Sequence, residues 1–171
     1  IKIVADSTCD LSKDLVEKYD IQIAPLHIVL DEKEYFDGVD ITPDEIYAWA
    51  DSNEKMPKTS AIGFEEAEKI MAQIKDTDDE MILFTISGKM STTVNVFRMV
   101  AEELEIENKV SIIDSENLST GIGLMVLKAS TMAQEGKSRE EICVAINDVK
   151  DRVRASFEDS CLLSRPFRPS F

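Results

Sequence analysis

Residues 80–104 give the strongest indication of the fold: E80-M-I-L-F-T-I86 continues through S87-G-K-M-S-T-T93 into V94-N-V-F-R-M-V-A-E-E-L104. The first segment is a continuous apolar run, which predicts a buried strand, and the last segment has the spacing of a helix. The turn between them is rich in hydroxyl side chains. Because hydroxyls and free backbone N–H groups at a helix start suit an anion, this turn is a candidate anion site.

The same order of strand, polar turn and helix is found on both sides of this stretch. The strand I1-K-I-V-A5 precedes D6-S-T-C-D10 and a short helix near 11–19, and the strand V110-S-I-I-D114 precedes a helix from Leu118 to about Glu135, ended by Gly136. Continuous apolar strands that alternate with helices are typical of parallel strands buried on both faces. We therefore predict the α/β class, as a layered α/β/α domain with a mostly parallel sheet.

The remaining segments are predicted from local signals. Residues 21–30 alternate as a strand does, with a hairpin return near residues 35–36, and a helix is expected over 64–75. Thr42 with Glu45, and Ser138 with Glu141, have the spacing of capping boxes and predict two further helix starts, the second helix running to about residue 153. Residues 51–60 are predicted to form a loop.

Composition narrows the function classes. The chain has 171 residues, 19 basic and 34 acidic, with a net charge of -15, which argues against binding nucleic acid or an anionic membrane through a broad basic surface. There is no apolar run of the roughly 18 residues that a membrane span needs, so no stable membrane insertion is expected. Three widely spaced cysteines suit a reducing cytoplasm, and clustered metal ligands are lacking, so neither a metal nor a cofactor is predicted.

Polar residues follow three predicted strands and should gather at one edge of the sheet, where such folds bind ligands. The loop that holds Thr59 and Ser60 precedes a helix and could join them. Any single hydroxyl at a helix start is usually a cap, whereas four such loops together form a neutral, donor-rich site that suits one carboxylate better than a polyphosphate. The strand-end residues expected to support this site are Asp6, Ser7, Asp114, Ser115 and Ser119.

Other chemistries fit the sequence less well. A phosphate loop would need glycine at Leu83 and a hydroxyl at Met90, and a dinucleotide fingerprint would need glycine at Val126. Tight helix packing is the better explanation for Gly121 and Gly123. His27, the only histidine, lies in a strand pattern and is interpreted as a strand residue and not as a catalyst. Asp6 and Asp114 could hold Mg²⁺, although Asp at a strand end more often caps the following loop.

Four segments also resemble, in order, the motifs of the DegV family of bacterial fatty-acid-binding proteins. They are D6-S-T-C-D-L11, P57-K-T-S60, I86-S-G-K-M-S-T-T93 and D114-S-E-N-L-S-T-G-I-G123. The resemblance implies a cytoplasmic protein that holds one long-chain fatty acid, with its carboxylate on hydroxyls and its tail in a buried tunnel. It implies Thr59 and Ser91 as carboxylate donors, with Ser60 and Thr92 as second choices, and a separate fatty acid kinase as a partner in phospholipid synthesis.

The sequence departs from the family pattern at three places. Thr92 stands where the family has glycine, Met90 where it has leucine, and Ala61-Ile62 where it has Gln-Pro. The resemblance covers residues 1–157, which we take as the N-terminal domain. Residues 158–171 are expected to be an irregular tail or a truncated remnant of the family's second domain.

We therefore expect a lipid-binding protein, not an enzyme, that carries a fatty acid to a separate kinase. Apolar faces of the helices at 64–75, 94–104 and 118–135 are the candidate tunnel walls. The alternative is an enzyme acting on a small phosphorylated metabolite, with a metal held by the strand-end Asp residues.

Overall fold

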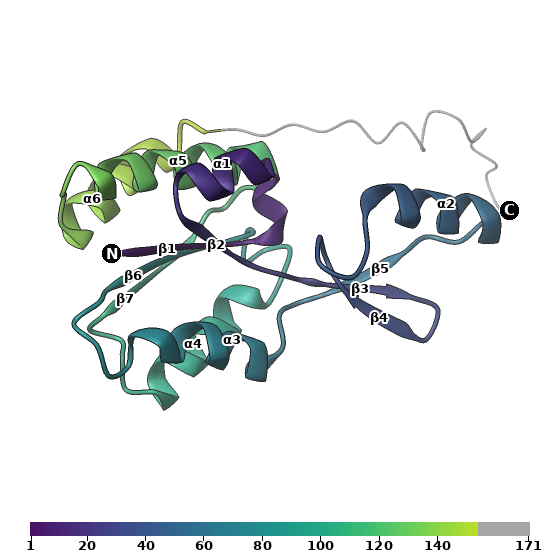
Figure 1. The fold of residues 1–171 in the computed structure, drawn as a ribbon, viewed down its shortest axis with the longest axis horizontal. Coiled ribbons are helices and arrows are strands. Elements are labelled where there is room, and N and C mark those ends of the chain that lie inside the picture. Colours follow the sequence, from purple (N-terminus) through teal and green to yellow (C-terminus); the bar gives the residue numbers. More distant parts are fainter. Residues whose placement is uncertain (154–171) are drawn as a thin grey trace, which may run out of the picture.

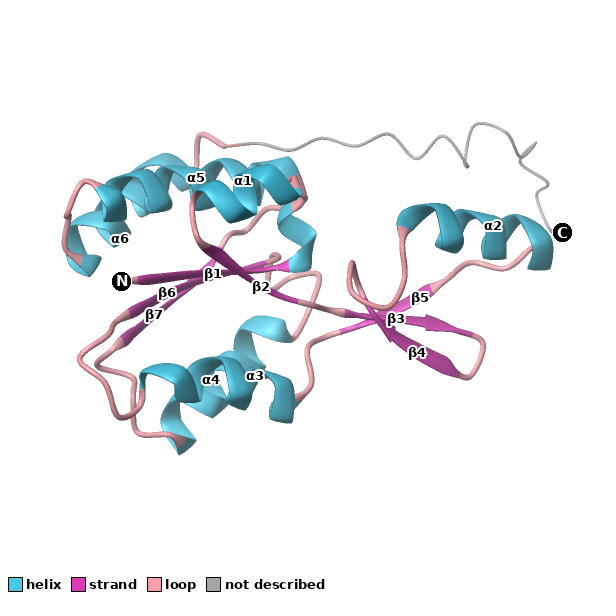
Figure 2. Ribbon diagram, viewed as in Figure 1, coloured by secondary structure: helices cyan, strands magenta, loops and turns pink. Residues whose placement is uncertain are grey.

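A computed structural model describes residues 1–153 of the chain. Its centre is a four-stranded parallel sheet in the order β2-β1-β6-β7. The strands are β1 (Lys2–Asp6), β2 (Ile21–Ala24), β6 (Met81–Thr85) and β7 (Val110–Asp114). Helices α1 (Lys13–Lys18), α5 (Thr120–Gln134) and α6 (Arg139–Lys150) lie on one face, and α3 (Phe64–Met71) and α4 (Thr93–Glu103) on the other (Figures 1 and 2). The predicted α/β/α layering with a parallel sheet is confirmed.

The buried side chains explain why β6 reads as a continuous apolar run. All five of its residues are buried, and they point alternately into the two helix layers. Leu83 packs with Phe97 of α4 in one core cluster, whereas Phe84 packs with Ile122 of α5 in the other. The helix faces that were candidate tunnel walls lie largely in these two clusters, so they form core.

A second, smaller sheet was not predicted as such. Strands β3 (His27–Leu30), β4 (Lys33–Phe36) and β5 (Lys58–Ser60) pair antiparallel in the order β4-β3-β5, and α2 (Pro43–Asn53) packs on this sheet through Trp49 and Ile46. Because β3 continues the path of β2, the small sheet lies beyond the carboxyl ends of the parallel strands (Figure 1).

The prediction of one strand over 21–30 was wrong. It is divided at Pro25 and Leu26 into β2, which belongs to the parallel sheet, and β3, which belongs to the small one. Pro25 has no N–H to give to a ladder, and the Leu26 N–H is donated to Ser7 Oγ at 3.2 Å. The loop predicted over 51–60 was wrong at both ends, because residues 51–53 belong to α2 and its last three residues form β5.

The local signals at helix ends are confirmed. In α2 the Glu45 N–H is donated to Thr42 Oγ1, and the Glu45 carboxylate accepts from the Thr42 N–H and hydroxyl, which lowers the pKa of Glu45. Ser138 and Glu141 make the same box at α6. Gly136 has φ of +78° just after α5, as expected of a helix-ending glycine. Two short 3₁₀ turns, η1 (Ser7–Cys9) and η2 (Ala72–Ile74), were not predicted.

The tail predicted over 158–171 lies outside the described residues. Within residues 1–153, no helix has both the length and the apolar character that crossing a bilayer requires.

Candidate functional site

The carboxyl edge of the parallel sheet is built around Asp6, the last residue of β1. Its side chain is fully buried, and Oδ2 accepts the Ile86 N–H at 2.6 Å, while Oδ1 accepts the Thr8 N–H at 3.2 Å and the Thr8 hydroxyl at 2.6 Å. Burial raises the pKa of Asp6 above its ordinary value of 3.8, and the hydrogen bonds from Thr8 and Ile86 act in the opposite direction. Asp6 therefore joins the turn after β1 to the turn after β6.

Asp114 joins the next pair of turns in the same way. Its Oδ1 accepts the Gly88 N–H and the Glu116 N–H, both at 3.0 Å. The Ser87 N–H is donated to the Asn117 carbonyl at 3.0 Å, which ties the same two turns again. The three strand-end turns are thus held together by side chains, as expected from their position at one sheet edge.

Several predicted site residues also help to hold these strand-end turns together, and the hydrogen bonds that do so are called the framework here. Ser7 Oγ accepts the Leu26 N–H. The buried Ser115 hydroxyl donates to the Asn117 carbonyl at 3.2 Å, and Ser115 Oγ accepts the Asn117 N–H at 3.1 Å. Ser119 precedes α5 with φ of +52° and ψ of -136° and no side-chain cap bond. A serine rarely adopts this conformation, and such strained positions gather at functional sites. Ser119 remains a candidate, whereas Ser7 and Ser115 serve the framework.

Ser91 and Thr92 lie where the turn after β6 enters α4. Ser91 Oγ accepts the Thr93 N–H at 3.2 Å and lies 2.9 Å from the Thr93 hydroxyl. Ser91 is half-buried, Thr92 is exposed, and Thr92 makes no side-chain cap bond to the helix. Two hydroxyls at the start of an eleven-residue helix leave donors available to an anion.

Thr59 and Ser60 lie on β5, both exposed, and therefore belong to the small sheet. Thr59 pairs with Ile28 and Ser60 with His27. Since successive side chains of a strand point to opposite faces, the two hydroxyls face opposite sides of the small sheet. Ile28 belongs to the cluster packed against α2, so Thr59 shares the face of α2.

His27 makes side-chain contacts that the sequence did not predict. As a strand residue it begins β3 as predicted, but it is also 9% exposed, with Nδ1 2.6 Å from Glu34 Oε1 and its ring edge-on to Phe36. Nε2 has no hydrogen-bond partner among the described residues. Ser60 donates to the same Glu34 oxygen at 3.4 Å. The pairing of His27 with Glu34 follows from the hairpin register, which the sequence pattern does not specify.

The Asp residues proposed for a metal are engaged as loop caps. Asp6 and Asp114 each accept two or more hydrogen bonds from neighbouring turns. Within residues 1–153 no group of three or more His, Cys, Asp or Glu side chains is placed to hold a metal ion. The geometry therefore favours the capping role over the magnesium-dependent alternative.

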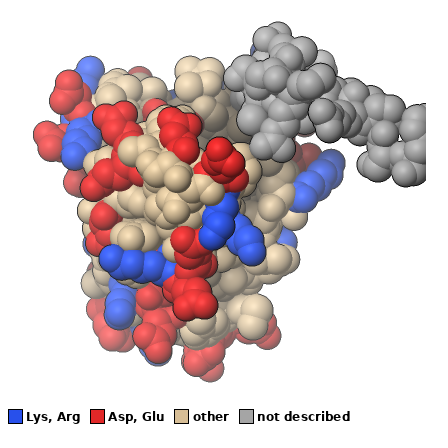
Figure 3. Space-filling view, turned by 90° about the vertical axis from the view of Figure 1, so that its right-hand side faces the viewer, with Lys and Arg blue, Asp and Glu red and all other residues tan. Residues whose placement is uncertain are grey.

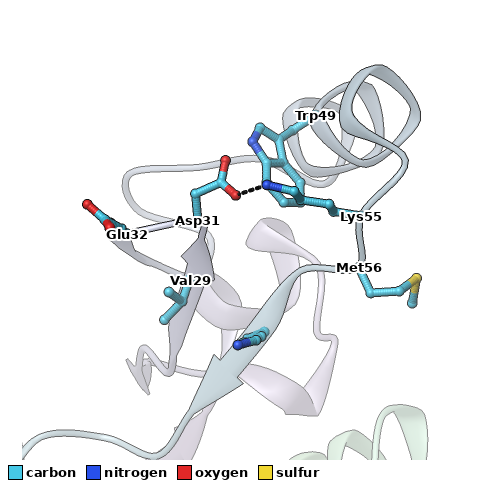
Figure 4. Close-up of a pocket in the computed structure, with 7 residues that line it drawn as sticks. Val29, Asp31, Glu32, Trp49, Lys55 and Met56 are labelled. Atoms are coloured by element: carbon cyan, nitrogen blue, oxygen red, sulfur yellow. Dashed lines mark hydrogen bonds and ion pairs between the residues drawn. The ribbon is translucent and has the colours of Figure 1, made fainter.

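Two hollows were compared with this edge by their lining. The first lies at the end of the small sheet where β3 turns into β4, with Val29, Asp31 and Trp49 among the residues that line it (Figure 4). Its Lys55 ammonium is paired with Asp31 at 2.6 Å, as the dashed line in Figure 4 shows. The second hollow, of about 530 Å³, lies between η1, α1, β2 and residues 37–43. Figure 3 shows that charges of both signs are interspersed on the end of the molecule that carries the small sheet.

This arrangement defines a layered α/β protein with hydroxyl-bearing turns at the sheet edge where such folds bind small molecules. The family model described as "Uncharacterised protein, DegV family" matches residues 1–159, and the chain belongs to the DegV family. A DegV domain-containing protein of Caldanaerobacter subterraneus is 35% identical over 154 residues, which are 90% of this chain and 54% of that protein. The chain spans about half the length of the curated relatives it matches.

Solved structures agree with this assignment. A Thermus thermophilus DegV family protein, described by its fatty acid binding, has a TM-score of 0.80 and 30% identity, covering 88% of this chain and 53% of that one. A stearic acid-binding protein from Eubacterium ventriosum has a TM-score of 0.76 and 32% identity, covering 85% and 52%.

Proposed function

We propose that this chain binds a long-chain fatty acid, with the carboxylate on Ser and Thr hydroxyls at the carboxyl edge of the sheet. The observation that carries the proposal is the set of turns joined by Asp6 and Asp114, which presents Ser91 and Thr92 at the start of α4. The fold around this edge is shared with the Thermus and Eubacterium proteins, both described as binding fatty acids.

The chemistry of the edge suits a single carboxylate. Hydroxyls and helix N-terminal amides donate to an anion without adding full charge. Lys58 and Lys89, both exposed, are the cations nearest to the proposed donors in sequence. A long acyl tail supplies most of the affinity, since each buried methylene contributes about 0.8 kcal/mol, and the hydroxyls set the orientation.

The same proposal includes the role of the bound lipid. The protein acts as a carrier and not as an enzyme, and it presents the fatty acid carboxylate to a separate kinase in the cytoplasm for phospholipid synthesis. This part rests on the resemblance of the motifs, with Thr59 and Ser91 as the first carboxylate donors and Ser60 and Thr92 as the second.

Replacing the donors is expected to weaken binding of oleate. Each of Thr59→Val and Ser91→Ala removes a hydrogen bond to a charged group, worth about 1.5–3 kcal/mol, and so lowers affinity by about tenfold or more. Titration calorimetry with oleate, after native mass spectrometry of the purified protein for a bound fatty acid, measures the change.

Controls come from the same chain. Thr131 is an exposed hydroxyl residue on α5 that donates to the Leu127 carbonyl, so Thr131→Ala is expected to leave oleate affinity unchanged. Ser60→Ala separates the two faces of β5: if the carboxylate lies on the Thr59 side, this variant binds as the unmodified protein does. Unchanged affinity in both Thr59→Val and Ser91→Ala would refute the proposed head-group site.

A further inference from the structure

β7 is an edge strand of the parallel sheet, with β6 on one side and no strand of residues 1–153 on the other (Figure 1). The Lys109 carbonyl accepts an N–H of β6 at 2.9 Å, and the Ser115 N–H is donated to a carbonyl of β6 at 3.2 Å. Because the backbone groups of a strand alternate in direction, the odd-numbered residues of β7 bond to β6. The N–H and carbonyl groups of Val110 and Ile112 therefore face outward, and they are called the open edge here.

Basic side chains of α6 close the two ends of this strand. Arg139 Nη2 donates to the Asn108 carbonyl at 2.7 Å, just before β7 begins. Lys150 Nζ donates to the Asp114 carbonyl at 3.4 Å, where β7 ends. Basic side chains at a sheet edge hinder pairing with a further strand. The open edge lies between these two contacts and is not covered by either of them.

A hollow lies beside the open edge. No loop or side chain of residues 1–153 bonds to the outward groups of Val110 and Ile112. The hollow has a volume of about 320 Å³ and lies between β7 and α4, with Val110, Ile112, Arg98 and Glu102 among the residues that line it. Outward backbone groups next to a hollow can accept a strand together with its side chains.

The open edge is complementary to itself in one register. In an antiparallel pair about a two-fold axis at Ser111, Val110 of one copy lies opposite Ile112 of the other, and each N–H donates to the opposing carbonyl. A pair centred on either outward residue would need the carbonyls that Arg139 and Lys150 already occupy. We propose that β7 pairs in this way with β7 of a second copy of the chain, an inference that is independent of fatty acid binding.

The side chains next to the open edge also fit a second copy. Val110 and Ile112 lie on the α4 face of the sheet, and this register places Ile112 of one copy beside Val110 of the other, at the hollow. Arg98 and Glu102 are exposed on α4, and none of the ion pairs within residues 1–153 includes either of them. Because the two-fold axis reverses the direction of α4, it brings Arg98 of each copy toward Glu102 of the other.

Several features keep this pairing weak. Each copy carries a net charge of -15, so two copies repel each other. Arg139 donates to Ser111 Oγ at 2.8 Å, which places both Arg139 side chains near the axis, although each is paired with Glu80 at 2.8 Å. One pair of strands with its flanking helices is also small beside stable interfaces, which bury about 1,200–2,000 Å². We therefore expect association only in concentrated protein.

The direct test follows amide hydrogen exchange of the ¹⁵N-labelled full chain as its concentration is raised from about 20 μM to about 1 mM. We expect the amides of Val110 and Ile112 to exchange rapidly in dilute protein and severalfold more slowly in concentrated protein. The amides of Ser111 and Ile113, which face β6, should exchange slowly throughout and serve as the internal reference. Sedimentation velocity on the same samples should show a mass that rises from one copy toward two.

Charge reversal on α4 gives the matched variants. Arg98→Glu and Glu102→Arg each place like charges across the axis, so each is expected to lower the association constant about tenfold. An equimolar mixture of the two variants should associate again, because the mixed pair has opposite charges at both contacts. Lys128→Glu makes the same change of charge at an exposed position on α5 and should leave association unchanged.

Three results would overturn the inference. The first is a chain that stays monomeric up to about 1 mM, with Val110 and Ile112 exchanging rapidly at every concentration. The second is a dimer in which other amides gain protection and these two do not. The third is a dimer that the two α4 variants and their mixture leave unchanged, since the copies would then meet elsewhere. None of these results bears on the proposed fatty acid binding.

Discussion

Asp6→Ala is expected to lower the free energy of unfolding by about 2–6 kcal/mol, because each of two backbone donors left without an acceptor costs about 1–3 kcal/mol. The substitution leaves the Ile86 and Thr8 N–H groups without their acceptor at a position with no solvent exposure. Urea unfolding followed by circular dichroism measures the loss. Asp51→Ala on α2 gives the control, because it removes a carboxylate that is open to solvent without a left-handed backbone conformation.

The pH dependence of Asp6 has a definite sign. Because burial raises its pKa in the folded protein, the folded state holds the proton more tightly than the unfolded chain does. The stabilising contribution is therefore complete below the ordinary value of 3.8 and is lost as the pH rises through the folded pKa.

Asp6→Asn isolates this titration. The neutral amide keeps one acceptor oxygen but cannot ionise. The unfolding free energy of the unmodified protein should therefore fall relative to that of Asp6→Asn as the pH rises from about 4. Unfolding curves between pH 4 and pH 7 measure it. A difference that stays constant, or shifts the other way, would show that the hydrogen bonds from Thr8 and Ile86 outweigh burial.

Gly123→Ala is expected to lower the free energy of unfolding by about 2 kcal/mol, even though alanine favours a helix by about 1 kcal/mol over glycine. A methyl group at this position in α5 would lie 2.7 Å from the Cys9 carbonyl oxygen and 3.0 Å from Leu11 Cδ2. The backbone oxygen of η1 has to move away, and this displacement costs more than the gain in helix propensity.

Thr131→Ala in the same helix is the control for Gly123→Ala. Its side chain is exposed and its replacement improves helix propensity without adding contacts, so thermal unfolding should show an unchanged or slightly higher midpoint. A Gly123→Ala protein that is as stable as the Thr131→Ala protein would mean that η1 and α5 adjust freely.

The parts of the fold that could be predicted from the sequence are those with strong local signals. The run from Met81 to Thr85 is buried on both faces, and its apolar side chains leave few alternatives to a central parallel strand. Thr42 and Ser138 cap their helices through side-chain bonds that involve only four consecutive residues of sequence. The packing role predicted for Gly123 is confirmed by its approach to Cys9.

The small sheet could not be predicted because its information is non-local. The three residues of β5 are all exposed, so they show no apolar alternation, and only their pairing with β3 identifies them as a strand. For the same reason the contact of His27 with Glu34 depends on a hairpin register that is known only from the structure. Single polar residues at a turn give no comparable signal in the sequence.

The candidate site was predictable in part. The meeting of the strand-end turns follows from parallel strands, and the structure joins them through Asp6 and Asp114. The hydrogen bonds of Ser7 and Ser115 to neighbouring turns could not be predicted from residue type, because the same hydroxyl can cap a turn or bind a ligand. The roles of Thr59, Ser60, Ser91 and Thr92 as ligand donors stay predictions.

The division of residues 21–30 between two sheets has a consequence for the order of folding. Every strand of the small sheet and α2 lie within residues 27–60, so this unit has only short-range pairings to make. The parallel sheet must bring β1 to β6 across roughly eighty residues, a closure that is slower because of its loop entropy. During synthesis, residues 27–60 emerge from the ribosome before β6 does, and N-terminal units fold first as the chain emerges. We expect the small sheet to form first and to hold the end of β2 in place while the central sheet assembles.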